Sequence, residues 1–232
     1  MTGTEALLRS GTSALPVSIS AVADRFGIKL VDYAAFSKVY DIDTQELYRR
    51  ISYGGFSFMA EGRYVCVLNS ALCHTPRRRW TAAHELGHIL SGHITDQLIT
   101  LSQEQEREAD AFAAELLAPL TVLHFCGVSS AAEIERLCGL SHQAAEFRFS
   151  ELSRKRRAQD DLFRIGLRRC SSYSDGEIPT VTAPESIFLS TEHDRELLLS
   201  FSPFIGSYIA RRSQHDGYEQ YLLRKNREPM AI

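Results

Sequence analysis

The residues best suited to chemistry are His84, Glu85 and His88, which form the pattern H-E-x-x-H. Positions four apart lie one turn apart on the same helix face, so both imidazoles can reach a single cation. Zinc binds histidine nitrogen at about 2.0–2.1 Å and prefers tetrahedral ligand sets. Glu85 would project beside the metal, where a carboxylate can accept a proton from water as a general base. The pattern therefore predicts a metal site in which Glu85 is the catalytic residue.

The alternative is a surface helix that carries two solvated histidines. Trp80, Ala83 and Leu90 flank the pattern and favour a helix packed into a core. Neutral histidines in a packed helix need partners, and a cation supplies one.

A catalytic zinc also needs a third protein ligand and one open position. A third histidine six residues after His88 is excluded, because that position is Ile94 and His93 is one residue out of phase. In the helix predicted over 103–117, Glu106 and Asp110 lie one turn apart on one face. Glu106 would complete a His-His-Glu ligand set, and Asp110 would accept a hydrogen bond from a ligand histidine.

The acidic start of this helix allows a second interpretation. Glu104, Glu106 and Glu108 could form a solvated first turn, since the helix dipole favours negative charge there. Glu108 is a weaker ligand candidate than Glu106, because it lies about 200° around the helix from it.

The sequence around these motifs predicts a mainly helical chain with a few short strands. Pro76 opens the first motif helix, and a Gly-containing turn joins two β-rich runs into a hairpin. The second of these runs, 63–69, is expected to present an edge on which an extended substrate adds as a strand. Pro203 is expected to interrupt the apolar stretch 197–210. Helices are predicted over 17–26, 42–51, 76–92, 103–117, 130–138 and 142–157, and strands over 28–33, 56–60 and 63–69.

The segments RRRWTAAHELGHILSGH and EREADAFAAELLAP resemble the ImmA/IrrE family of metallopeptidases. That family shows R-x-x-x-A-H-E-x-G-H followed by E-x-x-A-(N/D)-x-F-A-x-x-L-L-x-P. The resemblance is close over 79–119 and extends in element order over about 15–155. The family's usual L-L-M-P reads L-L-A-P here, which changes packing and leaves the metal set untouched. The resemblance implies that His84, His88 and Glu106 bind the metal and that Glu85 is catalytic.

The same resemblance implies a fold and a function. The expected class is α+β, with a mainly helical zincin-like core and a small sheet beside the active-site helix. We expect this core over 1–125, a helix-turn-helix-like pair over 126–170, and a tail or small subdomain over 171–232, with a linker at 171–177. The implied activity is zinc-dependent endopeptidase, with manganese as a second possible metal. Family members cleave helix-turn-helix repressors of phages, mobile elements or stress regulons, and cleavage relieves repression.

Two other functions remain open at this point. One is a non-catalytic regulatory or protein-binding module that uses the metal only for structure. The other is a DNA-binding regulator whose zincin core is a relic. Glu85 favours the peptidase, because a structural site needs no base and prefers a closed shell of four ligands.

The stretch 136–169 carries nine Arg or Lys and four Asp or Glu, a local charge of +5. It could contact DNA through the basic run 154–157, dock onto a repressor partner, or form a helical pair that completes the fold. We favour the last interpretation. Direct nucleic-acid binding is not the expected function. If the protein does bind nucleic acid, we expect the contact to be made by 136–169.

A further donor is expected for the oxyanion that forms during peptide hydrolysis. Tyr64, His93 and a residue of the tail are candidates. For His93, a capping or solvated role after Gly92 is the favoured interpretation.

Composition bounds the setting in which the chain works. The net charge is −3, which does not indicate nucleic-acid or membrane binding. The five cysteines are odd in number and form no C-x-x-C pair, which is typical of reduced thiols. We find no basic start followed by a long apolar run and no stretch of about 18 apolar residues, so neither a signal peptide nor a membrane span is expected. The predicted location is the cytoplasm.

Overall fold

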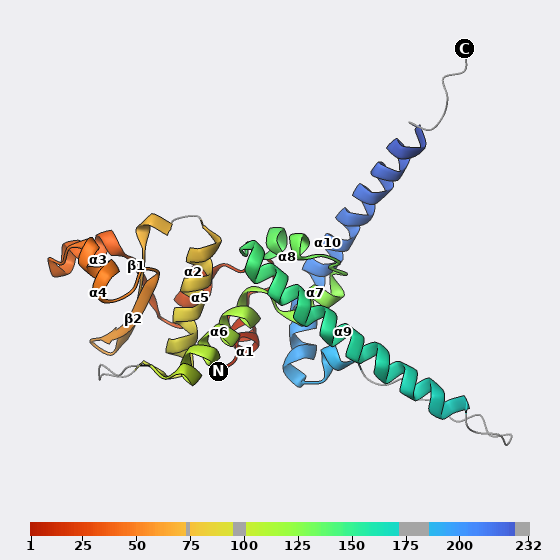
Figure 1. The fold of residues 1–232 in the computed structure, drawn as a ribbon, viewed down its shortest axis with the longest axis horizontal. Helices are drawn as coiled ribbons and strands as arrows, with labels where there is room; N and C mark the ends of the chain where they lie inside the picture. Colours follow the sequence, from red (N-terminus) through yellow and green to blue (C-terminus); the bar gives the residue numbers. More distant parts are fainter. Residues whose placement is uncertain (73–74, 95–100, 172–185, 226–232) are drawn as a thin grey trace, which may run out of the picture.

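A small three-stranded sheet lies beside the helix that carries the H-E-x-x-H pattern. The structure is a computed structural model that describes all residues except 73–74, 95–100, 172–185 and 226–232. The strands are β1 (Lys29–Asp32), β2 (Gly55–Ala60) and β3 (Arg63–Leu68), in the order β1-β3-β2. Helices make up most of the rest (Figure 1), which confirms the α+β class. The expected linker at 171–177 lies outside the described residues, apart from its first residue.

The hairpin between β2 and β3 is confirmed, but the expected edge strand is wrong. Glu61 and Gly62 form its turn with φ of 52° and 71°, as a two-residue type I′ turn requires. Because β1 pairs with β3 in parallel and β2 pairs with β3 in antiparallel, β3 is the central strand. The edge next to the H-E-x-x-H helix is therefore β2.

The two faces of the sheet pack against different helices because side chains alternate along a strand. Val65 and Val67 of β3 face a small cluster with Tyr33, Phe36 and Leu47. These last three come from α3 (Tyr33–Tyr40) and α4 (Thr44–Arg50). The intervening residues Cys66 and Leu68 face the main core, which contains α5. This alternation decides which β2 side chains can reach α5 (Pro76–Leu90), the helix with the H-E-x-x-H pattern.

Two long helices, α5 (Pro76–Leu90) and α6 (Gln103–Leu117), carry the two sequence motifs. Thr75 caps α5 by accepting a hydrogen bond from a backbone N–H, with Pro76 at its first turn. Ser102 caps α6 in a capping box. Both helices begin where the sequence predicts.

The helices α5 and α6 approach each other at Gly87. A Cβ added there would lie 3.1 Å from both the Cα and the carbonyl oxygen of Ala109, and 3.2 Å from Cβ of Phe112. Only a glycine opposite a small residue allows this approach. The spacing between the two motifs is thus set by backbone contact.

The remaining helices surround this pair. The long helix α10 and three short helices had no counterpart in the sequence prediction; the short ones are α1, α3 and α7. Each short helix has at most eight residues, too few for the apolar period to stand out. The bounds are α1 Gly3–Ser10, α2 Ile19–Arg25, α7 Leu120–Phe125, α8 Ala131–Cys138, α9 His142–Ser171 and α10 Glu192–Lys225, with short 3-10 turns at Ser70–Leu72 and Ile187–Leu189.

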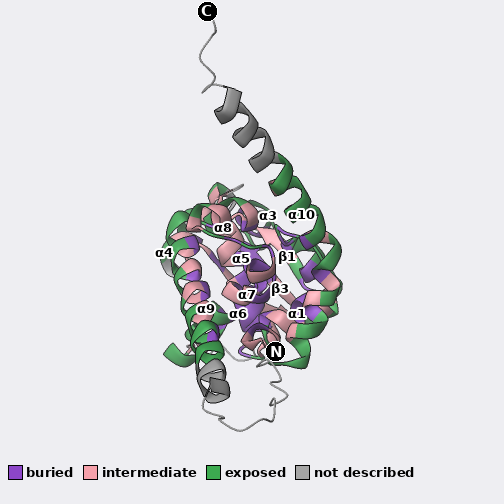
Figure 2. Cartoon of the chain, turned by 90° about the vertical axis from the view of Figure 1, so that its right-hand side faces the viewer, coloured by how far each residue is buried: buried purple, intermediate pink, exposed green. Residues whose placement is uncertain are grey.

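One main core runs through these elements, and buried residues lie at the centre of the molecule in Figure 2. It includes Ala6 of α1, Leu86 of α5, Leu116 of α6, Leu152 of α9 and Phe201 of α10. Residues from the C-terminal part of the chain are therefore packed with those of the metal helices.

The expected interruption at Pro203 is wrong, because α10 continues through it. Leu197, Phe201 and Ile205 follow one another at intervals of four residues and are all buried in the core. Burying each large apolar side chain stabilises the fold by about 1.5–3 kcal/mol. Together the three outweigh the roughly 3 kcal/mol cost of a proline inside a helix. In addition, the Ser202 hydroxyl donates to the Leu198 carbonyl one turn back.

Arg79, the arginine of the family pattern, ties α5 to two distant segments. Its Nη2 donates to the carbonyl oxygens of Val17 (2.9 Å) and Cys138 (3.3 Å). Gly139, with φ of 66°, ends α8 directly over the Arg79 side chain. Burial lowers the pKa of this guanidinium. The arginine thus stabilises packing through backbone acceptors.

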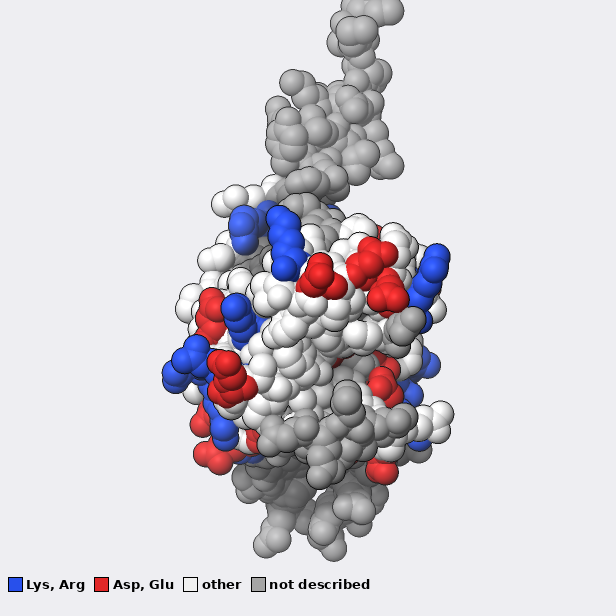
Figure 3. Space-filling model, turned by 90° about the vertical axis from the view of Figure 1, so that its left-hand side faces the viewer, with Lys and Arg blue, Asp and Glu red and all other residues white. Residues whose placement is uncertain are grey.

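The outer face of the sheet region carries charges of both signs. Figure 3 views the molecule from the side of α3 and α4, and its described Lys, Arg, Asp and Glu residues are interspersed around an uncharged centre. Such a face lacks the single-signed field that attracts nucleic acid. Among the described residues, no helix combines the length and apolar character needed to cross a membrane.

Gly87→Ala tests the backbone contact between α5 and α6, with Gly206→Ala as its control. Both glycines lie inside helices, but a Cβ at Gly206 would meet nothing within 4 Å. Alanine favours a helix by about 1 kcal/mol over glycine at either position. We expect Gly87→Ala to have a free energy of unfolding about 1–3 kcal/mol lower than Gly206→Ala, because the helices must separate. Equal values in urea denaturation would show that the approach is not tight.

Candidate metal centre

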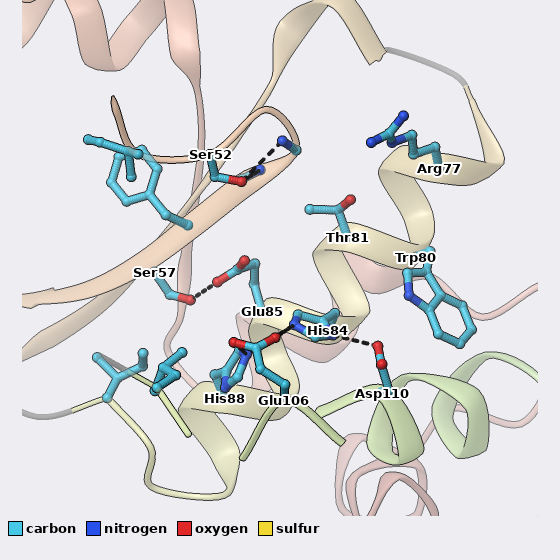
Figure 4. Close-up of a pocket in the computed structure, with 16 residues that line it drawn as sticks. Ser52, Ser57, Arg77, Trp80, Thr81, His84, Glu85, His88, Glu106 and Asp110 are labelled. Carbon is cyan, nitrogen blue, oxygen red and sulfur yellow. Dashed lines mark hydrogen bonds and ion pairs between the residues drawn. The ribbon is translucent and has the colours of Figure 1, made fainter. Parts of the chain in front are cut away.

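Three side chains from α5 and α6 converge on one point (Figure 4). Nε2 of His84 and Nε2 of His88 are 3.0 Å apart. Glu106 approaches both, with Oε2 3.3 Å from Nε2 of His84 and Oε1 3.7 Å from Nε2 of His88. Among the described residues, this is the one group of histidine, cysteine and acidic residues with the spacing of a metal site.

These separations fit a tetrahedral metal. Ligand atoms about 2.0–2.1 Å from a tetrahedral zinc lie roughly 3.4 Å from one another. The two imidazole nitrogens are 3.0 Å apart, and each has an oxygen of the Glu106 carboxylate at 3.3 or 3.7 Å, close to this value. Two imidazoles and one carboxylate are also ligands that zinc prefers. The side chains present are therefore suited to hold the metal that the sequence pattern predicts.

Asp110 lies on the far side of His84 from this cluster. Its Oδ1 is 2.9 Å from Nδ1 of His84. A carboxylate accepts hydrogen bonds, so Nδ1 of the neutral ring carries the hydrogen and Nε2 presents its lone pair to the cluster.

His88 is almost fully buried, with only 2% of its surface exposed. Burial, followed by the neighbouring His84 and His93, lowers its pKa to about 4. The ring is therefore neutral near pH 7, as a metal ligand must be.

Glu85 reaches from α5 toward the sheet instead of joining the cluster. It is 9% exposed, and its Oε2 accepts a hydrogen bond from the Ser57 hydroxyl on β2. Burial raises the pKa of this carboxyl, while the Ser57 hydrogen bond opposes the rise. A carboxylate with a raised pKa is better matched to accept a proton near neutral pH.

Ser57 was not predicted from the sequence. It faces α5 because Phe56 and Phe58, its neighbours in β2, pack on the opposite face of the sheet. The alternating pattern F-S-F indicates that Ser57 lies on the opposite face of the strand from the two phenylalanines. It does not indicate which helix packs against that face.

A pocket of about 640 Å³ opens over the cluster. It is lined by Glu85, the three converging residues and Asp110, together with β2 from Gly55 to Ser57 and the side chains of Arg77 and Trp80. Arg77 lies over the ring of Tyr53, 5.1 Å from its centroid. The convergence point is thus accessible to a ligand the size of a peptide segment.

Two of the candidate oxyanion donors, Tyr64 and His93, lie outside the pocket. Tyr64 of β3 packs against the main core, and His93 is buried behind His88; neither lines the pocket.

The basic run 154–157 is partly engaged in packing. Arg156 donates through Nη1 to the carbonyl of Val128 at 2.6 Å, and Lys155 lies over the ring of Phe188. Arg148 precedes the run on the same helix. It is buried and donates to the carbonyl of Ala118.

Comparison with known proteins adds one finding. The peptidase M78 family model, described as the IrrE N-terminal-like domain, matches residues 23–157, more than half of the chain. No curated protein matches.

Glu106→Ala tests the third ligand, with Glu104→Ala as its control. Both residues lie in the first turn of α6 and are exposed, but Glu104 lies outside the converging group. We expect Glu106→Ala to weaken zinc affinity more than about 100-fold, because even groups that only orient a ligand are worth 10- to 100-fold. Glu104→Ala should leave it unchanged. Competition with a chelating dye measures both, and similar affinities would remove Glu106 from the ligand set.

Proposed function

Because the chain belongs to the IrrE N-terminal-like family of zincin-like metallopeptidases, we propose that it is a zinc-dependent endopeptidase that cleaves a helix-turn-helix repressor. Cleavage would relieve repression of a phage, mobile-element or stress regulon. The observation that carries the proposal is the convergence of His84, His88 and Glu106 beneath an open pocket with Glu85 beside them. Manganese is the alternative metal for the same ligands.

A bound zinc would polarise the scissile carbonyl and lower the pKa of a water molecule at its open position. Glu85 is the base in this proposal. Its Oε2 is held by Ser57, which leaves Oε1 to accept a proton from the attacking water and deliver it to the leaving amine. Holding one oxygen in place orients the other, so less freedom is lost during the reaction.

The edge strand β2 is the proposed binding site for the substrate backbone. It lines the pocket from Gly55 to Ser57, and its outer edge has no paired strand among the described elements. An extended peptide that pairs with β2 would pass over the converging side chains. Glycine at position 55 is needed on the inner side, where a Cβ would lie 2.8 Å from the carbonyl oxygen of Val67.

A repressor substrate is supported by the family resemblance. The proposed docking surface for the repressor lies on the helical pair α8 and α9, where Phe147 is exposed. We place the reaction in the cytoplasm, since Cys66, Cys126 and Cys138 are free thiols.

Glu85→Gln provides the test of catalysis. The purified protein is incubated with zinc and the repressor encoded beside it, and cleavage is followed on a gel. We expect Glu85→Gln to retain zinc and lower the cleavage rate by about 10²- to 10⁴-fold, because the amide cannot accept a proton. Glu104→Gln, the same change on the exposed start of α6, should cleave like the wild type.

The outcomes separate the candidate functions. Equal cleavage by wild type and Glu85→Gln would exclude Glu85 as the base. Repressor binding without cleavage by either protein would favour a non-catalytic binding module with a structural metal.

A further inference from the structure

A line of hydrogen bonds runs from the group formed by His84, His88 and Glu106 to the side away from the pocket. Nδ1 of His88 is 3.0 Å from Nδ1 of His93. Nε2 of His93 is in turn 2.9 Å from Oε2 of Glu108. His93 is buried, with 6% of its side chain exposed, whereas more than half of the Glu108 side chain is exposed. The line therefore connects the most buried ligand candidate to the protein surface.

The turn that ends α5 places His93 beside His88. Gly92 adopts φ of 77°, and its N–H bonds to the carbonyl of Ile89, while the N–H of His93 bonds to the carbonyl of His88. These two bonds define a Schellman motif, which brings the second residue after the cap against the third residue from the helix end. That contact is usually apolar, but here it joins two imidazoles whose centroids are 5.2 Å apart.

The direction of the hydrogen bonds follows from the carboxylate at the end of the line. Glu108 can only accept, so Nε2 of His93 carries a hydrogen and donates it. Nδ1 of a neutral His93 then has a free lone pair and accepts from Nδ1 of His88. With its hydrogen on Nδ1, His88 directs the lone pair of Nε2 toward His84 and Glu106.

We propose that Glu108 and His93 are positioning residues that hold His88 in the tautomer and orientation required for metal binding. Neither touches the metal or substrate in this proposal, which rests on the proposed metal site. Nδ1 of His84 has the Asp110 carboxylate as its direct partner, whereas Nδ1 of His88 has the imidazole of His93. Groups that orient a metal ligand in this way are typically worth 10- to 100-fold in metal affinity.

The test compares substitutions that keep or remove the acceptor for His88. Leucine at position 93 cannot accept, whereas glutamine can accept from His88 through its oxygen and donate to Glu108 through its nitrogen. We expect His93→Leu and Glu108→Leu to weaken zinc affinity 10- to 100-fold, and His93→Gln to retain it within about threefold. His142→Leu and Glu104→Leu are the matched controls, since both residues are exposed and lie outside the line. Circular dichroism establishes that each variant is folded.

Nitrogen chemical shifts of the imidazoles provide a readout that does not depend on zinc. In the zinc-free wild type, the spectrum of His88 should show a single tautomer with hydrogen on Nδ1. In zinc-free His93→Leu it should show a mixture of both tautomers, and His93→Gln should restore the single form. The two controls should match the wild type.

The two measurements distinguish this proposal from the proposed function. A wild type that shows the single tautomer but binds neither zinc nor manganese would overturn the metallopeptidase and leave the orienting contact of His93 with His88 intact. A wild type that binds zinc, together with a His93→Leu variant of equal affinity and unchanged tautomer, would overturn the positioning role alone. Loss of affinity in His93→Leu and His93→Gln alike would also overturn it, because the acceptor would then be irrelevant.

Discussion

The close approach of α5 and α6 at Gly87 and Ala109 is the constraint on which the rest of the site depends. Gly87 directly precedes His88, and Ala109 lies between Glu106 and Asp110 on the next helix. Carboxylate side chains are short, so Glu106 reaches the two imidazoles only if the helix backbones come into contact. A Cβ on Gly87 would meet the backbone of Ala109 at 3.1 Å and prevent this. Helix packing therefore acts directly on the geometry of the converging side chains.

Most other groups around the site come from segments far apart in the sequence. Ser57 reaches Glu85 from β2, because strand alternation directs it toward α5. Arg79 holds the first turns of α5 to the segment before α2 and to the end of α8. The main core extends this support to α10, whose buried residues pack with those of α1 and α7. The helices α5 and α6 are thus fixed from several sides, which favours the preorganisation that the proposed catalytic site requires.

Features with a local cause could be predicted from the sequence, and features set by tertiary packing could not. Pro76 and the spacing of the motif residues located α5 and α6 and their motif faces, and a Gly-containing turn located the hairpin. Strand order was missed because β1 joins β3 across a long separation, so β3 became central and β2 the edge. The contacts of Ser57 and His93 were missed for the same reason, although Gly92 marked a helix end. Burial of Phe201 and its neighbours, which carries α10 through Pro203, is likewise a tertiary effect.

The helix α6 contributes acidic groups to both histidines from different directions. Glu106 faces the two Nε2 atoms, Asp110 supports His84 at Nδ1, and Glu108 reaches His88 through His93. Each of these three half-exposed carboxylates therefore has a histidine nitrogen as a neighbour. Because they share one helix, any displacement of α6 would move all three carboxylates together. A cation bound at the cluster would in turn stabilise the contact between α5 and α6, since binding to the folded state alone stabilises it. In the proposed metal site, metal binding and helix packing would therefore be coupled, and each would depend on the small residues where the helices meet.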